Sequence, residues 1–154
     1  MIYLDHHATT PIADEVIEVM GRALAGLAGN PGSVHTPGRA ARAAIDQARR
    51  QVANWVGSRE REVVFTSGGT EANNLALRAA WRVQSEQGRT RIISSTVEHP
   101  SVINTLKSLQ EDGAEVVWIP VSDHGALDEE AFEAALDERV ALVGRVRRDR
   151  RRRA

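Results

Sequence analysis

The stretch Val63-Val64-Phe65-Thr66-Ser67-Gly68-Gly69-Thr70-Glu71-Ala72-Asn73-Asn74 decides the fold of this 154-residue chain. Its apolar start, residues 63–65, predicts a short strand that is buried on both faces. The two glycines predict a sharp turn in which the backbone can come close to a ligand. Beyond them a helix is expected from about Thr70. The inner face of that helix would carry Ala72, Leu75, Ala76, Ala79 and Val83.

The start of this helix is a candidate phosphate site. The free N–H groups and the positive end of a helix dipole favour an anion. An alternative is that Ser67 to Thr70 form only a loop with a capping residue, since serine, threonine and glycine commonly start helices. The segment matches neither the nucleotide-binding loop nor the dinucleotide-binding glycine fingerprint. The residues alone therefore leave both interpretations open.

The rest of the chain alternates strands with helices. Further strands are expected at 91–95, 115–119 and 140–143, with helices over 16–27, 41–56, 98–109 and 131–136. Such alternation predicts an α/β fold with a mainly parallel sheet flanked by helices. Binding sites in these folds lie at the carboxyl ends of the strands, which are followed here by Ser67–Thr70 and Thr96–His99. If those two strands are neighbours, His99 lies near the phosphate site and could stack on a ring or transfer a proton. Its alternative role is that of a helix cap.

Composition excludes several classes of protein. With 42% hydrophobic and 27% charged residues, the chain has the balance of a globular domain. It contains no cysteine, so a disulfide, a thiolate metal site or a cysteine nucleophile within these residues is excluded, and no metal site is predicted. No apolar run is long enough to span a membrane, and the N-terminus lacks the pattern of a signal peptide. We therefore expect no membrane partner and a cytoplasmic location.

Four segments, in order, resemble the cysteine desulfurases of the class V aminotransferase group, which use pyridoxal 5'-phosphate. They are Tyr-Leu-Asp-His-His-Ala-Thr-Thr-Pro at 3–11, Gly-Asn-Pro-Gly-Ser-Val-His at 29–35, Val-Phe-Thr-Ser-Gly-Gly-Thr-Glu-Ala-Asn-Asn at 64–74 and Glu-His-Pro-Ser at 98–101. The likeness extends over about residues 2–143. It implies a partial, truncated large domain of a fold-type-I pyridoxal-phosphate-dependent transferase, which usually works as a homodimer.

The resemblance also implies roles for individual residues. Gly69 and Thr70 would bind the cofactor phosphate, and His99 would stack on the pyridine ring and assist proton transfer as a catalytic residue. The arm at 8–10 and the loop at 30–35 would help to shape the site. Gly32 departs from the serine that is more common in the family, and little consequence is expected.

The implied reaction removes sulfur from L-cysteine, giving alanine and an enzyme persulfide for a sulfur-acceptor or scaffold protein in iron–sulfur cluster or thiolation pathways. It needs a lysine to hold the cofactor and a cysteine to receive the sulfur. Family members continue past the fourth strand with a Ser-x-His-Lys motif and a cysteine loop that are absent here. Lys107 is the only lysine and lies two turns into a predicted helix. We therefore expect these residues to be inactive alone.

The last ten residues of the chain are much more basic than the rest. Residues 145–154 carry seven arginines and one aspartate, whereas the whole chain has a net charge of −1. The predicted organisation is an arm at 1–12, a partial cofactor-binding domain at 13–143 and an Arg-rich tail at 144–154. The tail is interpreted as the product of a frameshift or truncation, because arginine excess suggests GC-rich coding. An unpaired sheet edge would then be exposed, and aggregation is expected.

Two other functions stay open at this point. One keeps the family but changes the substrate, giving a selenocysteine lyase or another class V aminotransferase. The other is a non-catalytic module that binds a polyanion through the Arg-rich tail. Salt-sensitive nucleic-acid binding that is lost on deleting residues 145–154 would favour the second. Nucleic acid is not an expected partner under the desulfurase interpretation.

Overall fold

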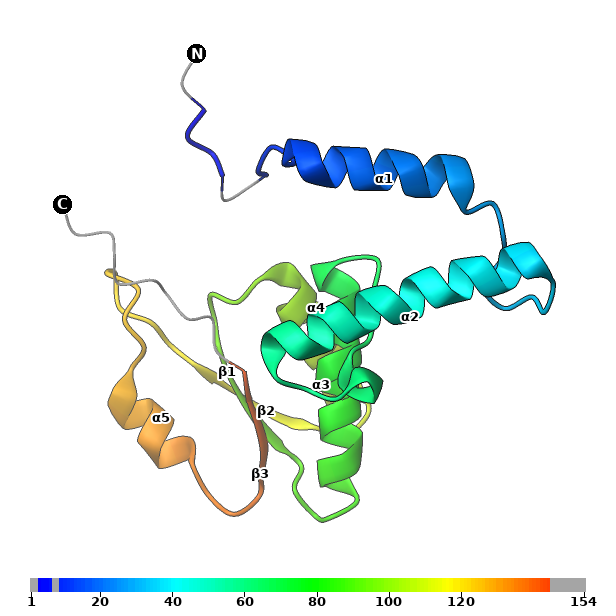
Figure 1. Cartoon of the computed structure of the whole chain (residues 1–154). Coiled ribbons are helices and arrows are strands. Elements are labelled where there is room, and N and C mark those ends of the chain that lie inside the picture. Colours follow the sequence, from blue (N-terminus) through cyan, green and yellow to red (C-terminus); the bar gives the residue numbers. More distant parts are fainter. Residues whose placement is uncertain (1–2, 7–8, 145–154) are drawn as a thin grey trace. The chain divides into compact units, whose positions relative to one another are not determined.

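A computed structural model describes residues 3–6 and 9–144 of the chain (Figure 1). These residues fall into two compact units, one ending at Phe65 and the other beginning at Thr66. Each unit is described by itself. The predicted Arg-rich tail beyond Gly144 and Ala8 of the arm lie outside the described residues.

The first unit is helical. Helix α1 spans Asp14–Gly26, and its first turn carries two acidic residues, which complement the positive end of the helix dipole. Helix α2 spans Thr36–Val56 and is followed by a short 3-10 turn, η1, at Glu60–Glu62. As predicted, α2 ends at Val56, and its C-cap is Gly57, whose left-handed φ of 70° is a conformation that glycine adopts without strain.

The apolar face of α1 is exposed in the described chain. Val16, Met20 and Leu24, which recur at helical spacing within the predicted helix at 16–27, are 48%, 50% and 83% exposed. The helix contains no buried residue. The periodicity thus predicts the helix and its apolar face correctly, but no core forms beneath that face within the first unit.

The predicted strand at residues 63–65 does not form, and this prediction is wrong. Val63 has extended backbone angles, with φ −92° and ψ 121°, but the segment belongs to no strand. Val64 and Phe65 are 62% and 48% exposed. A strand needs a neighbour that pairs with its N–H and C=O groups. Here the Val63 carbonyl instead accepts a hydrogen bond from Arg49 Nε at 3.3 Å, and the Arg49 guanidinium lies 5.4 Å from the centre of the Phe65 ring.

The second unit contains a parallel sheet of three strands. They are β1 at Arg91–Ser95, β2 at Glu115–Ile119 and β3 at Val140–Gly144, in the spatial order β2-β1-β3. Helix α3, at Gly69–Ser85, precedes β1; helix α4, at Pro100–Glu111, joins β1 to β2; and helix α5, at Glu129–Ala135, leads to β3. The predicted α/β class and the three later strands are confirmed.

Each face of the sheet has its own apolar core because successive strand residues point to opposite faces. Ile92 packs with Leu77 of α3 and with Leu106 and Leu109 of α4. Ile93, on the other face, packs with Ile119 and with Ala135 of α5. The sheet therefore lies between α3 and α4 on one side and α5 on the other (Figure 1).

A register shift marks the pairing of β1 with β3. Arg91 pairs with Val140, but the next residue, Ile92, pairs with Leu142. Residues two apart in a regular strand face the same side. The extra residue lets Val140 pack in the α5 core and Leu142 in the α3–α4 core. None of the helices in the described part of the chain is long and apolar enough to cross a membrane.

Candidate functional site

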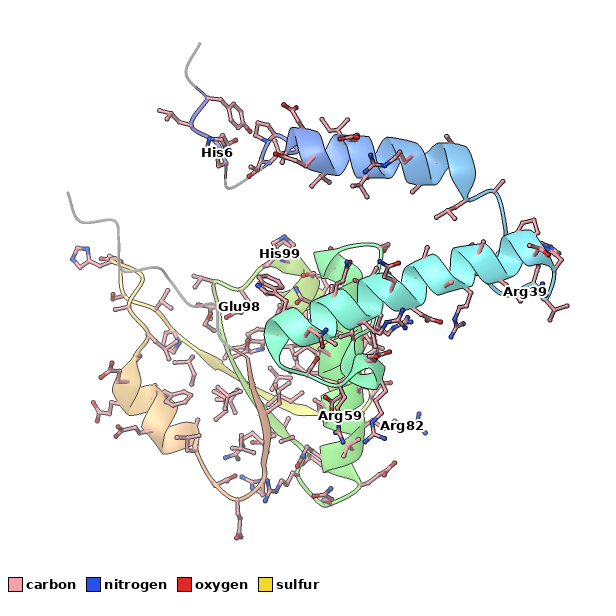
Figure 2. The ribbon with its side chains drawn as sticks, viewed as in Figure 1. His6, Arg39, Arg59, Arg82, Glu98 and His99 are labelled. Atoms are coloured by element: carbon pink, nitrogen blue, oxygen red, sulfur yellow. The ribbon has the colours of Figure 1, made fainter. Side chains whose placement is uncertain are left out.

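The carboxyl end of β1 carries a cluster of polar side chains. Ser95, the last strand residue, donates a hydrogen bond from its hydroxyl to Glu98 Oε1 at 3.1 Å. Both side chains belong to buried residues, at 5% and 7% exposure. Figure 2 shows Glu98 and His99 close together where the chain leaves the sheet and enters α4. This bond fixes the path of the loop that presents His99.

His99 is the N-cap of α4. Its extended backbone, with φ −60° and ψ 145°, precedes Pro100 at the first helical position, where the missing N–H leaves no bond unmade. Its ring nitrogen Nδ1 accepts a hydrogen bond from the backbone N–H of Ser101 at 3.1 Å. The capping role predicted as the alternative is therefore present. It occupies only one edge of the ring.

Two residues that the sequence analysis did not single out contact this histidine or its neighbour. The Ser101 hydroxyl lies 2.8 Å from His99 Nδ1, and Asn73 Nδ2 of α3 donates to that hydroxyl at 2.8 Å. Asn73 lies four residues after Gly69, one turn into α3. Its inward position at helical spacing from Gly69 and Leu77 was the available signal. The pairing with Ser101 had none, because it joins residues 28 positions apart.

His99 lines a cavity of about 300 Å³. The other lining residues come from α3, α4, the loop after β1 and the end of β3. They are Asn73, Ala76, Leu77, Glu98, Val102 and Gly144. The walls combine apolar side chains with a few polar groups, which is the usual make-up of a small-molecule site.

The start of α3 is open to solvent. Gly68, the N-cap, has an extended backbone and makes no side-chain cap. A Cβ built on Gly68 or Gly69 would meet no atom within 4 Å. The first N–H groups of a helix, here those of Gly69 and Thr70, have no acceptor inside the helix. There is therefore room for an anion at this helix end.

A carboxylate already lies at this helix start. Glu71 Oε2 accepts hydrogen bonds from the Ser67 backbone N–H at 2.6 Å and from the Ser67 hydroxyl at 2.7 Å. These bonds, that from the backbone first, lower the pKa of Glu71 below its ordinary value. The charge helps to cap the helix but would repel a bound phosphate.

The predicted site residues come from two packed helices. Gly69 and Thr70 begin α3, His99 caps α4, and the Asn73–Ser101 hydrogen bond ties the two helix starts together. The route differs from the predicted one, because no strand precedes α3. Gly69 and Thr70 are not among the residues that line the His99 cavity.

Other candidate groups lie elsewhere. The exposed Lys107 is in the second turn of α4, eight residues after His99. The loop at 30–35 belongs to the first unit, where Asn30 Oδ1 accepts from the Gly32 N–H at 2.8 Å. Within residues 3–6 and 9–144, no group of three metal-binding side chains occurs.

Comparison with known proteins shows the family to which the chain belongs and the proteins that it resembles. The aminotransferase class-V family model matches residues 2–146. A cysteine desulfurase of Trichormus azollae is 45% identical over 143 residues, and a putative cysteine desulfurase, IscS 1, of Bacillus subtilis is 39% identical over 142 residues. Those matches cover 93% and 92% of this chain but 35% and 37% of the relatives.

Solved structures agree with the sequence relatives. A NifS-like protein superposes with a TM-score of 0.81 at 34% identity, covering 94% of this chain and 39% of the other. The structure of SspA in complex with cysteine gives a TM-score of 0.77 at 32% identity, covering 93% and 41%. The predicted likeness to cysteine desulfurases and to their fold is confirmed, and the chain spans a little over one third of the relatives' length.

Proposed function

This chain belongs to the aminotransferase class-V family, and we propose that its second unit provides the phosphate and ring contacts of a pyridoxal 5'-phosphate site in a cysteine desulfurase. The family is pyridoxal-phosphate-dependent in general. The observation that carries the proposal is the hydrogen bond from Asn73 to Ser101, which joins the open start of α3 to the helix that His99 caps. The possible phosphate site at the start of α3 and the His99 imidazole that lines the cavity are thereby held on one pair of packed helices.

The residues present fit such a cofactor. Gly69 and Thr70 would donate their backbone N–H groups to the phosphate, which the α3 dipole also attracts. His99 would stack on the ring and act as the catalytic residue that holds a proton, while Leu77 and Val102 give the same cavity apolar walls. The cofactor, when bound, supplies an electron sink for breaking bonds of the amino acid.

The full reaction needs groups from outside these residues. The chain has no cysteine to receive sulfur, and Lys107 is exposed in the second turn of α4. The proposed substrate is L-cysteine, with alanine and a persulfide as products and a sulfur-acceptor protein as partner. We also propose a homodimer, a cytoplasmic location and the division into an arm at 1–12, a cofactor-binding part at 13–143 and a tail at 144–154. Polyanion binding would rest on residues 145–154, which the structure does not describe.

Cofactor binding can be measured on the chain itself. We expect pyridoxal 5'-phosphate to bind reversibly and pyridoxal, which lacks the phosphate, to bind at least tenfold more weakly, because charge-assisted hydrogen bonds are lost. His99→Ala should weaken binding, whereas Lys107→Arg should not. Titration followed by absorbance tests this. Equal affinity for pyridoxal 5'-phosphate and pyridoxal would contradict the proposed phosphate site at the start of α3.

Activity can be tested by replacement within a relative. Residues 2–144 would replace the matching segment of the Trichormus azollae enzyme, and alanine formation from L-cysteine would be assayed. We expect an active chimera whose activity falls strongly on His99→Ala. A folded chimera that binds the cofactor but forms no alanine would contradict the assignment as a desulfurase.

A further inference from the structure

We propose that Asn73 and Ser101 are positioning residues that hold the His99 ring with its proton on Nε2 and its Nδ1 edge fixed against α4. The inference rests on the proposed role of His99 and deepens it. Three side chains from two helices carry it: Asn73 of α3, Ser101 of α4 and the histidine that caps α4.

The direction of each hydrogen bond follows from what each group can do. The backbone N–H of Ser101 can only donate, so Nδ1 must accept it and carries no proton. The amide NH₂ of Asn73 also only donates, and the Ser101 oxygen accepts it. The Ser101 hydroxyl proton is then directed at its other neighbour, Nδ1, at 2.8 Å. The ring is thereby held as the neutral form protonated at Nε2.

This arrangement leaves one ring group for a ligand. Nε2 of His99 makes no hydrogen bond to the described residues, and the ring lines the cavity of about 300 Å³. Because both bonds to Nδ1 come from Ser101, the ring cannot turn without breaking them. Asn73, half-buried on α3, fixes the hydroxyl and thus couples ring orientation to the packing of α3 on α4.

A second histidine shows what the cap alone provides. His35 caps α2 in the same way, with Nδ1 accepting from the Gly38 N–H at 3.2 Å. No hydroxyl or amide side chain of the described residues joins that pair. Capping thus accounts for one hydrogen bond to Nδ1 in both histidines. The second contact at His99 Nδ1, from the Ser101 hydroxyl that Asn73 orients, has no counterpart at His35 among the described residues.

Asn73→Asp is the sharpest test because it changes the chemistry while keeping the shape. A carboxylate only accepts, so it would draw the Ser101 hydroxyl proton toward itself and away from Nδ1. The Ser101 oxygen would then accept from a protonated Nδ1 in those molecules whose ring gives up the cap bond from the Ser101 backbone N–H. Asn74→Asp is the matched control: it places the same charge on the next residue, whose Nδ2 donates, within the part of the chain that the structure describes, to the Thr70 carbonyl of its own helix at 3.0 Å.

The experiment is heteronuclear NMR on the full chain with isotope-labelled histidine, correlating ring protons with ring nitrogens. We expect His99 in the unsubstituted chain to be protonated at Nε2. In Asn73→Asp the ratio of Nδ1- to Nε2-protonated ring should rise about fivefold, the size expected for one hydrogen bond, while the cap bond from the Ser101 N–H still favours protonation at Nε2. His35 in every variant, and His99 in Asn74→Asp, should not change. Ser101→Ala, which removes the hydroxyl, should shift His99 in the same direction by less.

The results separate this inference from the proposed function, because the NMR measurement needs no cofactor. A His99 ring protonated at Nδ1 in the unsubstituted chain overturns the inference. So does a His99 ring whose protonation in Asn73→Asp and in Ser101→Ala is the same as in the unsubstituted chain. Failure of the chain to bind pyridoxal phosphate while the ring responds as expected contradicts the proposed function and supports the positioning network. Binding that depends on His99 but is equal in Asn73→Asp and Asn74→Asp overturns the network's part in ligand binding.

Discussion

The two ends of the same three-stranded sheet are built for different purposes. At the amino end, Arg91 of β1 lies 2.7 Å from both Glu115 and Asp137, and Arg139 lies 3.3 Å and 3.0 Å from the same two carboxylates. The four charges form a closed ring in which each is paired. At the carboxyl end, His99 lines a cavity together with Asn73 and Glu98, and its Nδ1 is held by Ser101 rather than by a charged group.

The two ends of the sheet differ in what their side chains do: the charged groups at the amino end pair with one another across the strands. The Arg91 side chain is only 13% exposed and pairs with carboxylates from two other segments, so it fixes the strand starts relative to one another. Its hydrogen bond lowers the pKa of Glu115. Desolvation acts to raise the pKa of Asp137, but hydrogen bonds from Arg139 and the two nearby guanidinium charges outweigh it, and the pKa is lowered. The paired end can hold the sheet, while the other end presents His99 Nε2, which makes no hydrogen bond to the described residues.

The largest effect should come from the core that both ends share. Leu106 is fully buried against Ile92 and Leu77, and Leu106→Ala should lower the free energy of unfolding by about 2–5 kcal/mol. Leu75, which was predicted for the inner face of this helix, is instead 48% exposed and provides the control: Leu75→Ala should change the free energy of unfolding by about 0.5 kcal/mol or less. Denaturant unfolding followed by circular dichroism measures both. An equal loss of unfolding free energy in Leu106→Ala and Leu75→Ala would show that Leu106 is not more buried than Leu75.

Breaking the amino end should affect stability without affecting the site. Arg91→Leu leaves Glu115 and Asp137 with Arg139 alone, and the melting temperature should fall by several degrees. The His99 ring signals should keep their unsubstituted form. Arg89→Leu, at a neighbouring exposed arginine that makes no ion pair among the described residues, should change the melting temperature little. A change in the His99 tautomer in Arg91→Leu would mean that the two ends are coupled.

The amino end should also respond to acid. The folded pKa values of Glu115 and Asp137 lie below their ordinary values of 4.5 and 3.8. Their contribution to stability is therefore present above those ordinary values and is lost as pH falls through the lowered folded values. The difference in melting temperature between the unsubstituted chain and Arg91→Leu should be full at neutral pH and vanish by about pH 2. A constant difference across this range would assign the effect of Arg91 to packing rather than charge.

Sequence reasoning predicted one kind of feature well. Local signals placed β1 at Arg91–Ser95 and β2 at Glu115–Ile119 and the end of α2 at Gly57, because alternation, helical spacing and glycine caps act over a few residues. They gave a strand at 63–65 that the structure does not form, since an apolar run predicts extended backbone but not the neighbour that completes a ladder.

The two ends of the sheet show the same limit. His99 was identified because it follows a strand and opens a helix, both of which are local facts. The Asn73–Ser101 pair and the pairs of Arg91 with Glu115 and Asp137 join residues 24 to 46 positions apart, and a single sequence carries no signal for such pairs. The roles of Gly69, Thr70 and His99 stay predictions until binding is measured.

The smallest effect concerns the one negative charge at the helix start that faces the proposed ligand. Glu71→Gln keeps the shape of the side chain and removes the charge that Ser67 now stabilises. Repulsion of phosphate falls, so pyridoxal 5'-phosphate should bind about two- to fivefold more tightly, the range expected for one charge at a helix end. Pyridoxal, which has no phosphate, should bind equally to both proteins. Glu86→Gln, at an exposed carboxylate just past the far end of α3, is the control and should not change either affinity. Weaker phosphate-dependent binding in Glu71→Gln would instead show that Glu71 supports the ligand-bound helix start by holding Ser67, and that its bonds to Ser67 outweigh its charge.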